Sequence, residues 1–250
     1  MKKLFVVIHI ITEEGISVEK RTLNQVTLAF DNGANGVFLI PAEGGFPVES
    51  TLKCYNSVRS VYPNKFIGIN FMASAAVVSK NIPMDASALW TDFGIGCQNH
   101  EKEIKTIKNS IHDIDWKGMY YGGFFFKGNN STFPENVTVM EKCINNAVNY
   151  IDVLTTSGSS TGISISLQRL KNIRECHKGI IAVASGVTAE NINEILNYAD
   201  EFIVGTGVEK KSDDNYLIEF YKSAGLPDAV QVGHLDPDKI RTLSAIISQY

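Results

Sequence analysis

Short apolar runs alternate along the chain with longer segments in which apolar residues recur every three or four positions. The longer segments are typical of amphipathic helices, as over 18–30, where Leu23, Val26, Ala29 and Phe30 share one face. The short runs, rich in β-branched and aromatic residues, are typical of buried strands. They predict strands at 4–10, 37–40, 66–71, 89–93, 119–126, 153–156, 180–183 and 202–204.

Eight strand–helix repeats in a chain of 250 residues predict an α/β fold, a single (β/α)8 TIM barrel with an extra C-terminal helix. We expect one domain over 1–250, in which 225–235 is a surface connection and the final helix begins at Asp236-Pro237. An open doubly wound sheet is the alternative. The absence of a GxGxxG motif after the first strand disfavours its nucleotide-binding version.

Composition and charge exclude some partners. The formal net charge of −4 and a sequence pI near 5.8 argue against bulk attraction to nucleic acid or to an anionic membrane. No apolar stretch reaches the roughly 18 residues needed to span a bilayer. The apolar start of the chain is short, contains His9 and lacks a cleavage site, so it predicts a first strand and no signal peptide.

The four cysteines are dispersed and form no CxxC pair. This spacing does not fit the known zinc-ligand patterns and is typical of reduced thiols in a cytoplasmic protein. We therefore expect a cytoplasmic location, and reduced side chains at Cys54, Cys97, Cys143 and Cys176.

Two neighbouring predicted strands both end in glycine, within the stretch 180–211. The first is followed by Ser185 and Gly186, and the second by Gly205 and Thr206. Glycine exposes backbone amides to an approaching anion, and the loops after the last two strands of a TIM barrel frequently bind a phosphate. These four residues are therefore predicted to bind phosphate. An Asp or Ser within 212–214 is predicted to cap the next helix.

The loop after the sixth predicted strand combines hydroxyl side chains with glycine. Alone it is equally consistent with an ordinary flexible turn. Beside the two glycine-ended strands it extends the predicted phosphate site to Ser157, Gly158 and Ser159.

Four further polar residues follow strands and are candidates for catalysis. Glu43 and Asp92 follow different strands, so they are predicted either to face each other as acid and base or a divalent-ion site, or to serve as caps or ion-pair partners. Lys127 is predicted to bind phosphate or carboxylate, to form an imine, or to lie in solvent. His9 is read either as catalytic or as a buried structural histidine.

Three segments resemble the BtpA/SgcQ family of TIM barrels: DVLTTSGSSTG at 152–162, VASGVTAEN at 183–191 and ADEFIVGTGVEKK at 199–211. The resemblance implies a (β/α)8 fold with phosphate contacts at Ser185, Gly186, Gly205 and Thr206, and it likens Lys127 to the lysine that ends the fifth strand of the family. Looser forms of these segments occur in ribulose-phosphate-binding barrels. The chain departs from the family pattern just before Lys127, where Gly123 and Phe125 replace an acidic residue and a histidine.

Together these features predict an enzyme acting on a small phosphorylated metabolite, a sugar phosphate or a nucleotide. A lyase, an isomerase or a glycosidic-bond hydrolase would each suit acid–base groups that face an anchored phosphate. The alternative is a non-catalytic barrel that binds a ligand or serves as an assembly factor. No organic cofactor is implied, and the sequence leaves open a divalent metal and a homo-oligomer.

Overall fold

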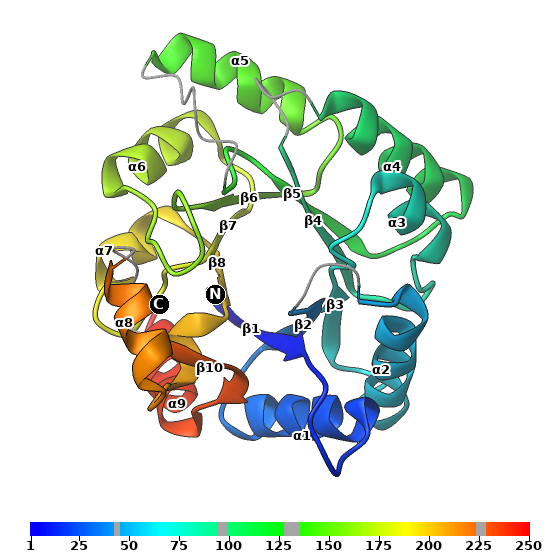
Figure 1. Ribbon diagram of the computed structural model, residues 1–250. Coiled ribbons are helices and arrows are strands. Elements are labelled where there is room, and N and C mark those ends of the chain that lie inside the picture. The colour runs from blue at the N-terminus through cyan, green and yellow to red at the C-terminus, as the bar shows by residue number, and fades with distance from the viewer. Residues whose placement is uncertain (43–45, 95–99, 128–135, 224–228) are drawn as a thin grey trace.

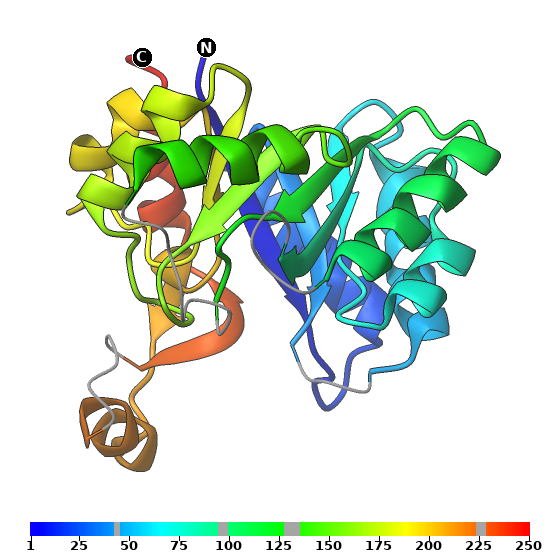
Figure 2. The same ribbon diagram turned by 90° about the horizontal axis from the view of Figure 1, so that it is seen from above.

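The computed structural model of the protein describes residues 1–42, 46–94, 100–127, 136–223 and 229–250. Strands β1 to β8 form a closed parallel barrel, in which each strand pairs with the next and β8 pairs with β1 (Figure 1). Helices surround the barrel on the outside, and both chain termini lie at its amino-terminal end (Figure 2). The predicted TIM barrel is confirmed.

The barrel strands are β1 (Lys3–Ile10), β2 (Gly36–Pro41), β3 (Phe66–Ile69), β4 (Ala88–Gly94), β5 (Met119–Gly123), β6 (Val153–Ser157), β7 (Ile181–Ala184) and β8 (Glu201–Val204). The helices between them are α1 (Val18–Asp31), α2 (Val48–Val61), α3 (Ala75–Asn81), α4 (Glu101–Asp113), α5 (Val137–Ala147), α6 (Leu167–Cys176) and α7 (Ile192–Ile195). After β8 the chain forms a 3-10 turn (Thr206–Val208), β9 (Glu209–Lys211), α8 (Asn215–Ser223), β10 (Val230–Leu235) and α9 (Pro237–Ile247).

Several boundaries differ from the sequence prediction. The fifth strand ends at Gly123 and not at Phe126, because Phe125 adopts a left-handed conformation (φ 49°) that turns the chain out of the sheet. The region 225–235, predicted as a connection, contains β10, which pairs antiparallel with β9. This hairpin has no alternating pattern to reveal it, because β9 consists of three charged residues.

Helix ends follow their capping residues. The Ser17 side chain accepts a hydrogen bond from the Lys20 amide at the start of α1. Asp236 accepts from the amides of Asp238 and Lys239, and Pro237 occupies the first turn of α9 as predicted.

The barrel interior is filled mainly by aromatic rings. Phe5, Phe38 and Tyr121 are fully buried, and Phe5 stacks on Phe66 at a centroid distance of 4.4 Å. Glycines on the same strands provide the room: a Cβ at Gly68 would lie 2.3 Å from the ring of Phe38. Large and small residues thus alternate around the barrel, so that the rings close its centre.

A polar contact lies among these apolar residues. The Tyr121 hydroxyl donates a 2.7 Å hydrogen bond to Oε2 of Glu201, and Lys3 forms a 3.0 Å ion pair with Oε1. Glu201 is almost completely buried, and both of its oxygens have partners. Its charge is therefore compensated at the amino-terminal end of β8, away from the carboxyl ends of the strands.

The state of the cysteines bears on the predicted cytoplasmic location. Cys143 is disulfide-bonded, whereas Cys54 and Cys176 carry free thiols. The prediction that all four cysteines are reduced is therefore wrong for Cys143, and cysteine chemistry no longer argues for a reducing compartment. In the part of the chain that the structure describes, every helix is too short or too polar to cross a membrane.

The fit between Gly68 and Phe38 predicts a coupled effect on stability. Gly68→Ala should lower the free energy of unfolding by about 1–3 kcal/mol, because the added methyl group overlaps the Phe38 ring. In the Gly68→Ala/Phe38→Leu double variant, the smaller side chain makes room, so the total loss should be less than the sum of the single losses. Urea unfolding of the four proteins measures this coupling, and simple additivity would contradict the packing account.

Candidate active site

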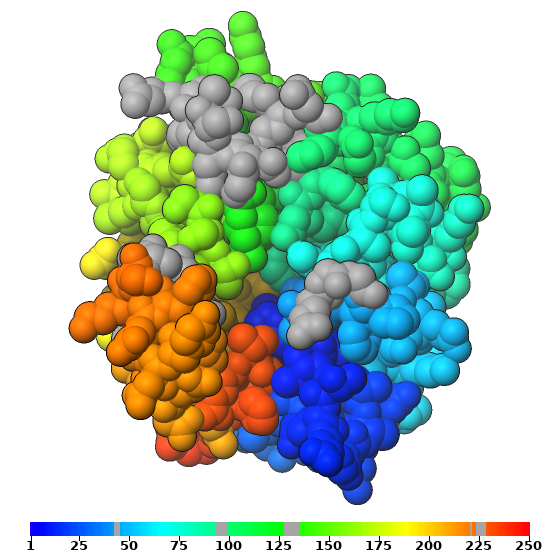
Figure 3. Space-filling view, in the orientation of Figure 1, coloured from blue at the N-terminus to red at the C-terminus, as the bar shows by residue number. Residues whose placement is uncertain are grey.

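The carboxyl ends of the strands open on the face shown in Figure 3, which is hollowed near its centre. In TIM barrels this end carries the active site, because the loops after all eight strands meet there. Three of the described non-glycine residues with positive φ follow barrel strands at this end: Met72, Phe125 and Ser185. Backbone strain of this kind is common at functional sites.

His9, near the end of β1, is held by a buried glutamate from outside the barrel. Its Nδ1 lies 2.7 Å from Oε1 of Glu209, the first residue of β9. The Glu209 side chain is fully buried, whereas His9 retains 18% exposure. Because a carboxylate only accepts hydrogen bonds, Glu209 favours a proton on Nδ1 and leaves Nε2 of the neutral ring as an acceptor.

Glu209 is itself fixed by the hairpin. Its Oε1 also accepts a 2.6 Å hydrogen bond from the Gly233 amide of β10. The Gly233 carbonyl in turn accepts from Arg21 of α1, whose Nε binds Glu13 at 2.6 Å. The β9–β10 hairpin is therefore tied to α1 at the point where it supports His9.

The exit of β8 lies directly against His9. A Cβ placed on Gly205 would be 3.3 Å from Cε1 of the His9 ring and 3.5 Å from Val7. Gly205 and Thr206 are partly exposed. The absence of a side chain at Gly205 thus leaves the β8 backbone accessible beside the histidine.

A second polar group lies on β3 to β5. The Asn70 side chain donates to Oδ1 of Asp92 at 3.3 Å and accepts a 2.9 Å hydrogen bond from the Met72 amide. Burial raises the pKa of the Asp92 carboxyl, while the positive charge of Lys127 and the Asn70 hydrogen bond act in the opposite direction. Asn70, Asp92 and Lys127 thus form one electrostatic group from three strands or strand exits.

A pocket of ≈ 350 Å³ adjoins this group. Asn70 and Asp92 line it on the polar side, together with apolar side chains and one further histidine. Its described lining consists of Asn70, Met72, Ala73, Val78, Thr91, Asp92, Phe93 and His100. Ligand pockets of this size combine an apolar wall with a few polar groups in the same way.

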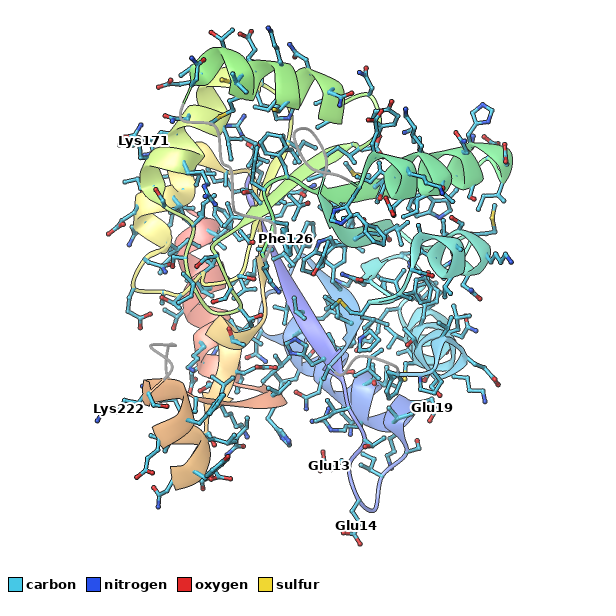
Figure 4. The ribbon with its side chains drawn as sticks, turned by 45° about the horizontal axis from the view of Figure 1, so that its top comes forward. Glu13, Glu14, Glu19, Phe126, Lys171 and Lys222 are labelled. Carbon is cyan, nitrogen blue, oxygen red and sulfur yellow. The ribbon has the colours of Figure 1, made fainter. Side chains whose placement is uncertain are left out.

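Among the residues described up to Lys127, the exit of β5 brings an aromatic ring into the barrel, and no acidic or histidine side chain. Phe126 is fully buried among the interior residues and packs edge-on against Trp90 at 5.7 Å, and it lies near the centre of the ring of strands in Figure 4. A Cβ added to Gly123 would lie 3.0 Å from the Cβ of Phe126. Phe126 therefore fills the space that a larger residue 123 would need.

Lys127 lies on a turn beyond β5, which ends at Gly123. Its amide donates to the Ser157 hydroxyl at 3.0 Å, and its Nζ lies 5.4 Å from the centre of the Phe126 ring. The cation therefore folds back over the aromatic filling of the barrel, within electrostatic range of Asp92.

The loops after β6, β7 and β8 pack on one another through their glycines. A Cβ on Gly158 or Gly186 would meet the backbone of Ile163 at 2.0 or 2.3 Å, and a Cβ on Gly207 would meet the Val187 carbonyl at 2.0 Å. The Gly186 carbonyl accepts hydrogen bonds from Ser164 and Asn191. Close loop packing is therefore one reason for glycine at these positions, independent of any ligand.

Backbone amides nevertheless remain available at the exits of β7 and β8. The amides of Ser185, Gly186, Gly205 and Thr206 donate no hydrogen bond to another described residue. Ser185 and Gly186 both have left-handed backbones, with φ of 71° and 65°. Successive amides in such conformations form concave anion sites.

The remaining predicted residues divide as follows. Ser157 is buried, and its hydroxyl accepts from the Lys127 amide and donates to the Gly158 carbonyl, so it links two loops; Ser159 is exposed. Glu43 lies outside the described residues. Among the residues that are described, no group of three or more His, Cys, Asp or Glu side chains is placed to hold a metal ion.

Sequence reasoning did not identify Glu209. It follows the glycine-ended β8 within a run of three charged residues, and such a run is ordinarily solvent-exposed. Only the pairing of β9 with β10 buries it against His9.

The fold and this mouth define a TIM barrel with polar residues gathered at the carboxyl ends of its strands. Residues 127–229 match the model of the BtpA family, so the resemblance stated from the sequence is confirmed over that range. The three segments that carried the resemblance all lie within it.

Relatives in sequence match a shorter part of the chain. An uncharacterized protein of Archaeoglobus fulgidus is 35% identical over 68 residues, which cover 27% of this chain and 28% of that protein. Uncharacterized protein MJ1115 of Methanocaldococcus jannaschii is 32% identical over 68 residues, covering 27% and 26%. The chain thus matches little more than a quarter of the length of these relatives.

Solved structures resemble the whole barrel. A thiamine phosphate pyrophosphorylase from Pyrococcus furiosus has a TM-score of 0.61 at 14% identity, covering 99% of this chain and 96% of that one. An N-acetylmannosamine-6-phosphate 2-epimerase from Clostridium perfringens has a TM-score of 0.56 at 13% identity, covering 82% and 86%. At such low identity these similarities show the fold alone.

The raised pKa of Asp92 predicts a pH-dependent stability difference. Because this pKa is higher in the folded protein than in the unfolded chain, the stability that Asp92 contributes is full at low pH and is lost as the pH rises. The neutral variant Asp92→Asn should therefore melt at a higher temperature than the wild type at neutral pH, and its advantage should shrink towards acidic pH. Thermal unfolding across this range measures the effect.

Asp113→Asn, at an exposed position near the end of α4, controls for the loss of one negative charge. A destabilised Asp92→Asn protein at neutral pH would contradict the assignment of a burial-dominated carboxyl.

Proposed function

We propose that the protein is an enzyme that uses acid–base catalysis on a small phosphorylated metabolite, either a sugar phosphate or a nucleotide. The phosphate binds at the exits of β7 and β8, and His9 acts as the acid–base group beside it. The observation that carries this proposal is the position of His9, which is fixed by buried Glu209 and lies against Gly205.

The phosphate-binding part of the proposal rests on the backbone. Ser185, Gly186, Gly205 and Thr206 contribute amides that bind no other described residue, and two of these residues have left-handed backbones. Backbone amides bind phosphate without a formal positive charge, so the net charge of −4 does not oppose such a site.

The acid–base part rests on the His9–Glu209 pair. A buried carboxylate that holds Nδ1 keeps one tautomer and one ring orientation, so that Nε2 can take and return a proton. Glu209 acts through His9 and is a positioning residue.

The opposite wall supplies complementary charges. Lys127 provides a cation that can stabilise a developing oxyanion, and Asp92 has a raised pKa suited to donating a proton. Acid and base groups on opposite sides of an anchored substrate suit a lyase, an isomerase or a glycosidic-bond hydrolase.

Two buried polar atoms add a recognition element. The indole Nε1 of Trp90 and the hydroxyl of Thr155 have no hydrogen-bond partner among the described residues. Trp90 lies on β4 and Thr155 lies on β6, the two strands that pair with β5. Hydroxyl groups of a sugar would satisfy such atoms.

The names of the two structural neighbours agree with this substrate class, since thiamine phosphate and N-acetylmannosamine 6-phosphate are both phosphorylated. The agreement is an analogy of fold. A non-catalytic ligand-binding barrel is the second candidate. Gly123 and Phe126 favour it, because neither residue brings a reactive group to the mouth.

Ligand-induced stabilisation tests the phosphate site. A pentose phosphate, a hexose phosphate or a nucleoside monophosphate should raise the melting temperature, with about 2.7 kcal/mol of stabilisation at 100 times its Kd, whereas the unphosphorylated counterpart should not. Gly205→Ala should abolish most of this shift, because its methyl group enters the space beside His9.

Gly15→Ala adds the same methyl group to an exposed turn with nothing within 4 Å and is the control for the ligand response. Because Gly15 has a left-handed backbone (φ 82°), this variant should itself melt at a lower temperature, so the ligand-induced shifts are compared. If no phosphorylated ligand in the panel stabilises the protein, or if both variants respond alike, the phosphate site is wrong.

Kinetics test the acid–base pair once a substrate is found. His9→Asn should lower kcat by about 10²–10⁴-fold with little change in KM. Glu209→Gln should lower kcat by at least about 10-fold and alter the pH profile of kcat/KM, because the imidazole loses its fixed tautomer. Turnover unaffected by His9→Asn would exclude His9 from catalysis, and a stabilising ligand without any turnover would favour the non-catalytic barrel.

A further inference from the structure

The side chain of Arg21 is buried beside the residues that support His9. It is only 3% exposed, and an arginine is rarely buried to this extent unless its charge is paired. Its Nε donates to Glu13 at 2.6 Å, and its Nη2 donates to the Gly233 carbonyl at 2.8 Å. Its Nη1 has no hydrogen-bond partner among the described residues. These contacts therefore use only part of the buried guanidinium.

Glu209 carries the opposite charge and is buried in the same way. Its Oε1 lies 2.7 Å from Nδ1 of His9 and accepts a 2.6 Å hydrogen bond from the Gly233 amide, whereas its buried Oε2 has no partner among the described residues. No lysine or arginine of the described chain forms a direct ion pair with this carboxylate. A buried carboxylate without a compensating cation tends to take up a proton. The ionised form of Glu209 therefore depends on a positive charge close by.

Arg21 and Glu209 meet at one residue, Gly233 of β10. Arg21 binds its carbonyl and Glu209 binds its amide. Gly233 has a left-handed backbone (φ 77°), and a Cβ added to it would lie 3.3 Å from Nη1 of Arg21 and 3.2 Å from the His9 carbonyl. A single glycine thus separates the buried cation from the buried carboxylate. Water screens the attraction between them only weakly at such a buried site.

The neighbouring charges leave this role to Arg21. Glu13 is 48% exposed and lies on the loop between β1 and α1, which projects away from the barrel (Figure 4), so water screens its charge. Lys239 of α9 is only half-buried, and its Nζ donates to the backbone carbonyl of Glu209 at 2.6 Å. Of the two cations at this group, only Arg21 is buried.

We propose that Arg21 is a positioning residue, whose charge keeps Glu209 ionised and thereby sets the tautomer of His9. An ionised Glu209 only accepts hydrogen bonds, so Nδ1 of His9 carries the proton and Nε2 is the acceptor. A neutral Glu209 can donate to Nδ1, and the proton of the neutral ring then lies on Nε2, which no longer serves as a base. The meaning of this role for catalysis rests on the proposed function of His9.

Nitrogen-15 NMR of the ligand-free protein tests the role, because protonated and unprotonated ring nitrogens differ widely in chemical shift. Spectra are recorded at about pH 8.5 or above, where an ordinary imidazole is neutral. The His9 signals are assigned by their loss in His9→Asn. The wild type should show the proton on Nδ1. Arg21→Gln should change the tautomer ratio at least about tenfold towards Nε2, because Glu209 no longer accepts a charge-assisted hydrogen bond. Arg21→Lys retains the charge and should restore the wild-type ratio.

Arg174→Gln is the matched control. Arg174 also joins an acidic side chain to a backbone carbonyl, since its Nη2 binds Asp200 and its Nε donates to the Tyr198 carbonyl at 3.1 Å. This group lies at the amino-terminal end of β8, away from His9. The control variant should melt at a lower temperature than the wild type, as Arg21→Gln should, but should leave the His9 tautomer unchanged. A merely structural role of Arg21 predicts the same result for both variants.

An Arg21→Gln protein with the wild-type tautomer would overturn the proposal, and so would a wild-type protein with its proton on Nε2. Arg21→Met keeps the apolar stem of the side chain and provides the same readout if the glutamine variant does not fold. The measurement needs no substrate. A negative result therefore leaves the phosphate site intact, and a ligand panel without hits leaves the tautomer result intact.

Discussion

Closure of the barrel by the pairing of β8 with β1 is the constraint on which the rest of the structure depends. Once eight parallel strands form a ring, the inward side chains must fill its centre at the density of a protein interior. In this chain aromatic rings fill the centre, and glycines such as Gly68 supply the space for them. The rings include Phe5, Phe38, Phe66 and Tyr121. Neither a ring nor the glycine beside it can therefore be enlarged alone without a steric clash.

Closure also places the chemistry. Because parallel strands all end at the same edge, residues separated by most of the chain meet at one mouth, as His9 and Gly205 do. On β3 and β4 the interior becomes polar towards this mouth, with Asn70 and Asp92, whereas at the exit of β5 it remains aromatic, with Phe126. Burial raises the pKa of Asp92, so a carboxylate at this position is expected to lower stability at neutral pH, a feature common to active sites.

The elements after β8 depart most from a regular barrel. The β9–β10 hairpin brings Glu209 to His9 and simultaneously carries α8 away from the sheet. One insertion thus supports the candidate catalytic residue and presents an apolar helix to solvent. Arg21 and Lys239 secure its base through hydrogen bonds to Gly233 and Glu209.

The sequence by itself determined the repeat of strands and helices and the barrel, because periodicity is a local property that burial imposes on each segment. It also indicated His9, Asp92 and the glycine-ended strands, since the barrel fixes which end of each strand is functional. Only the tertiary structure decided that Glu209 is buried, that Phe126 fills the place beside Gly123 and that α8 is exposed. These three features depend on contacts between residues that are far apart in the chain. The sequence around a charged or apolar residue is the same whether its side chain contacts a distant partner or solvent, so the sequence alone could not reveal them.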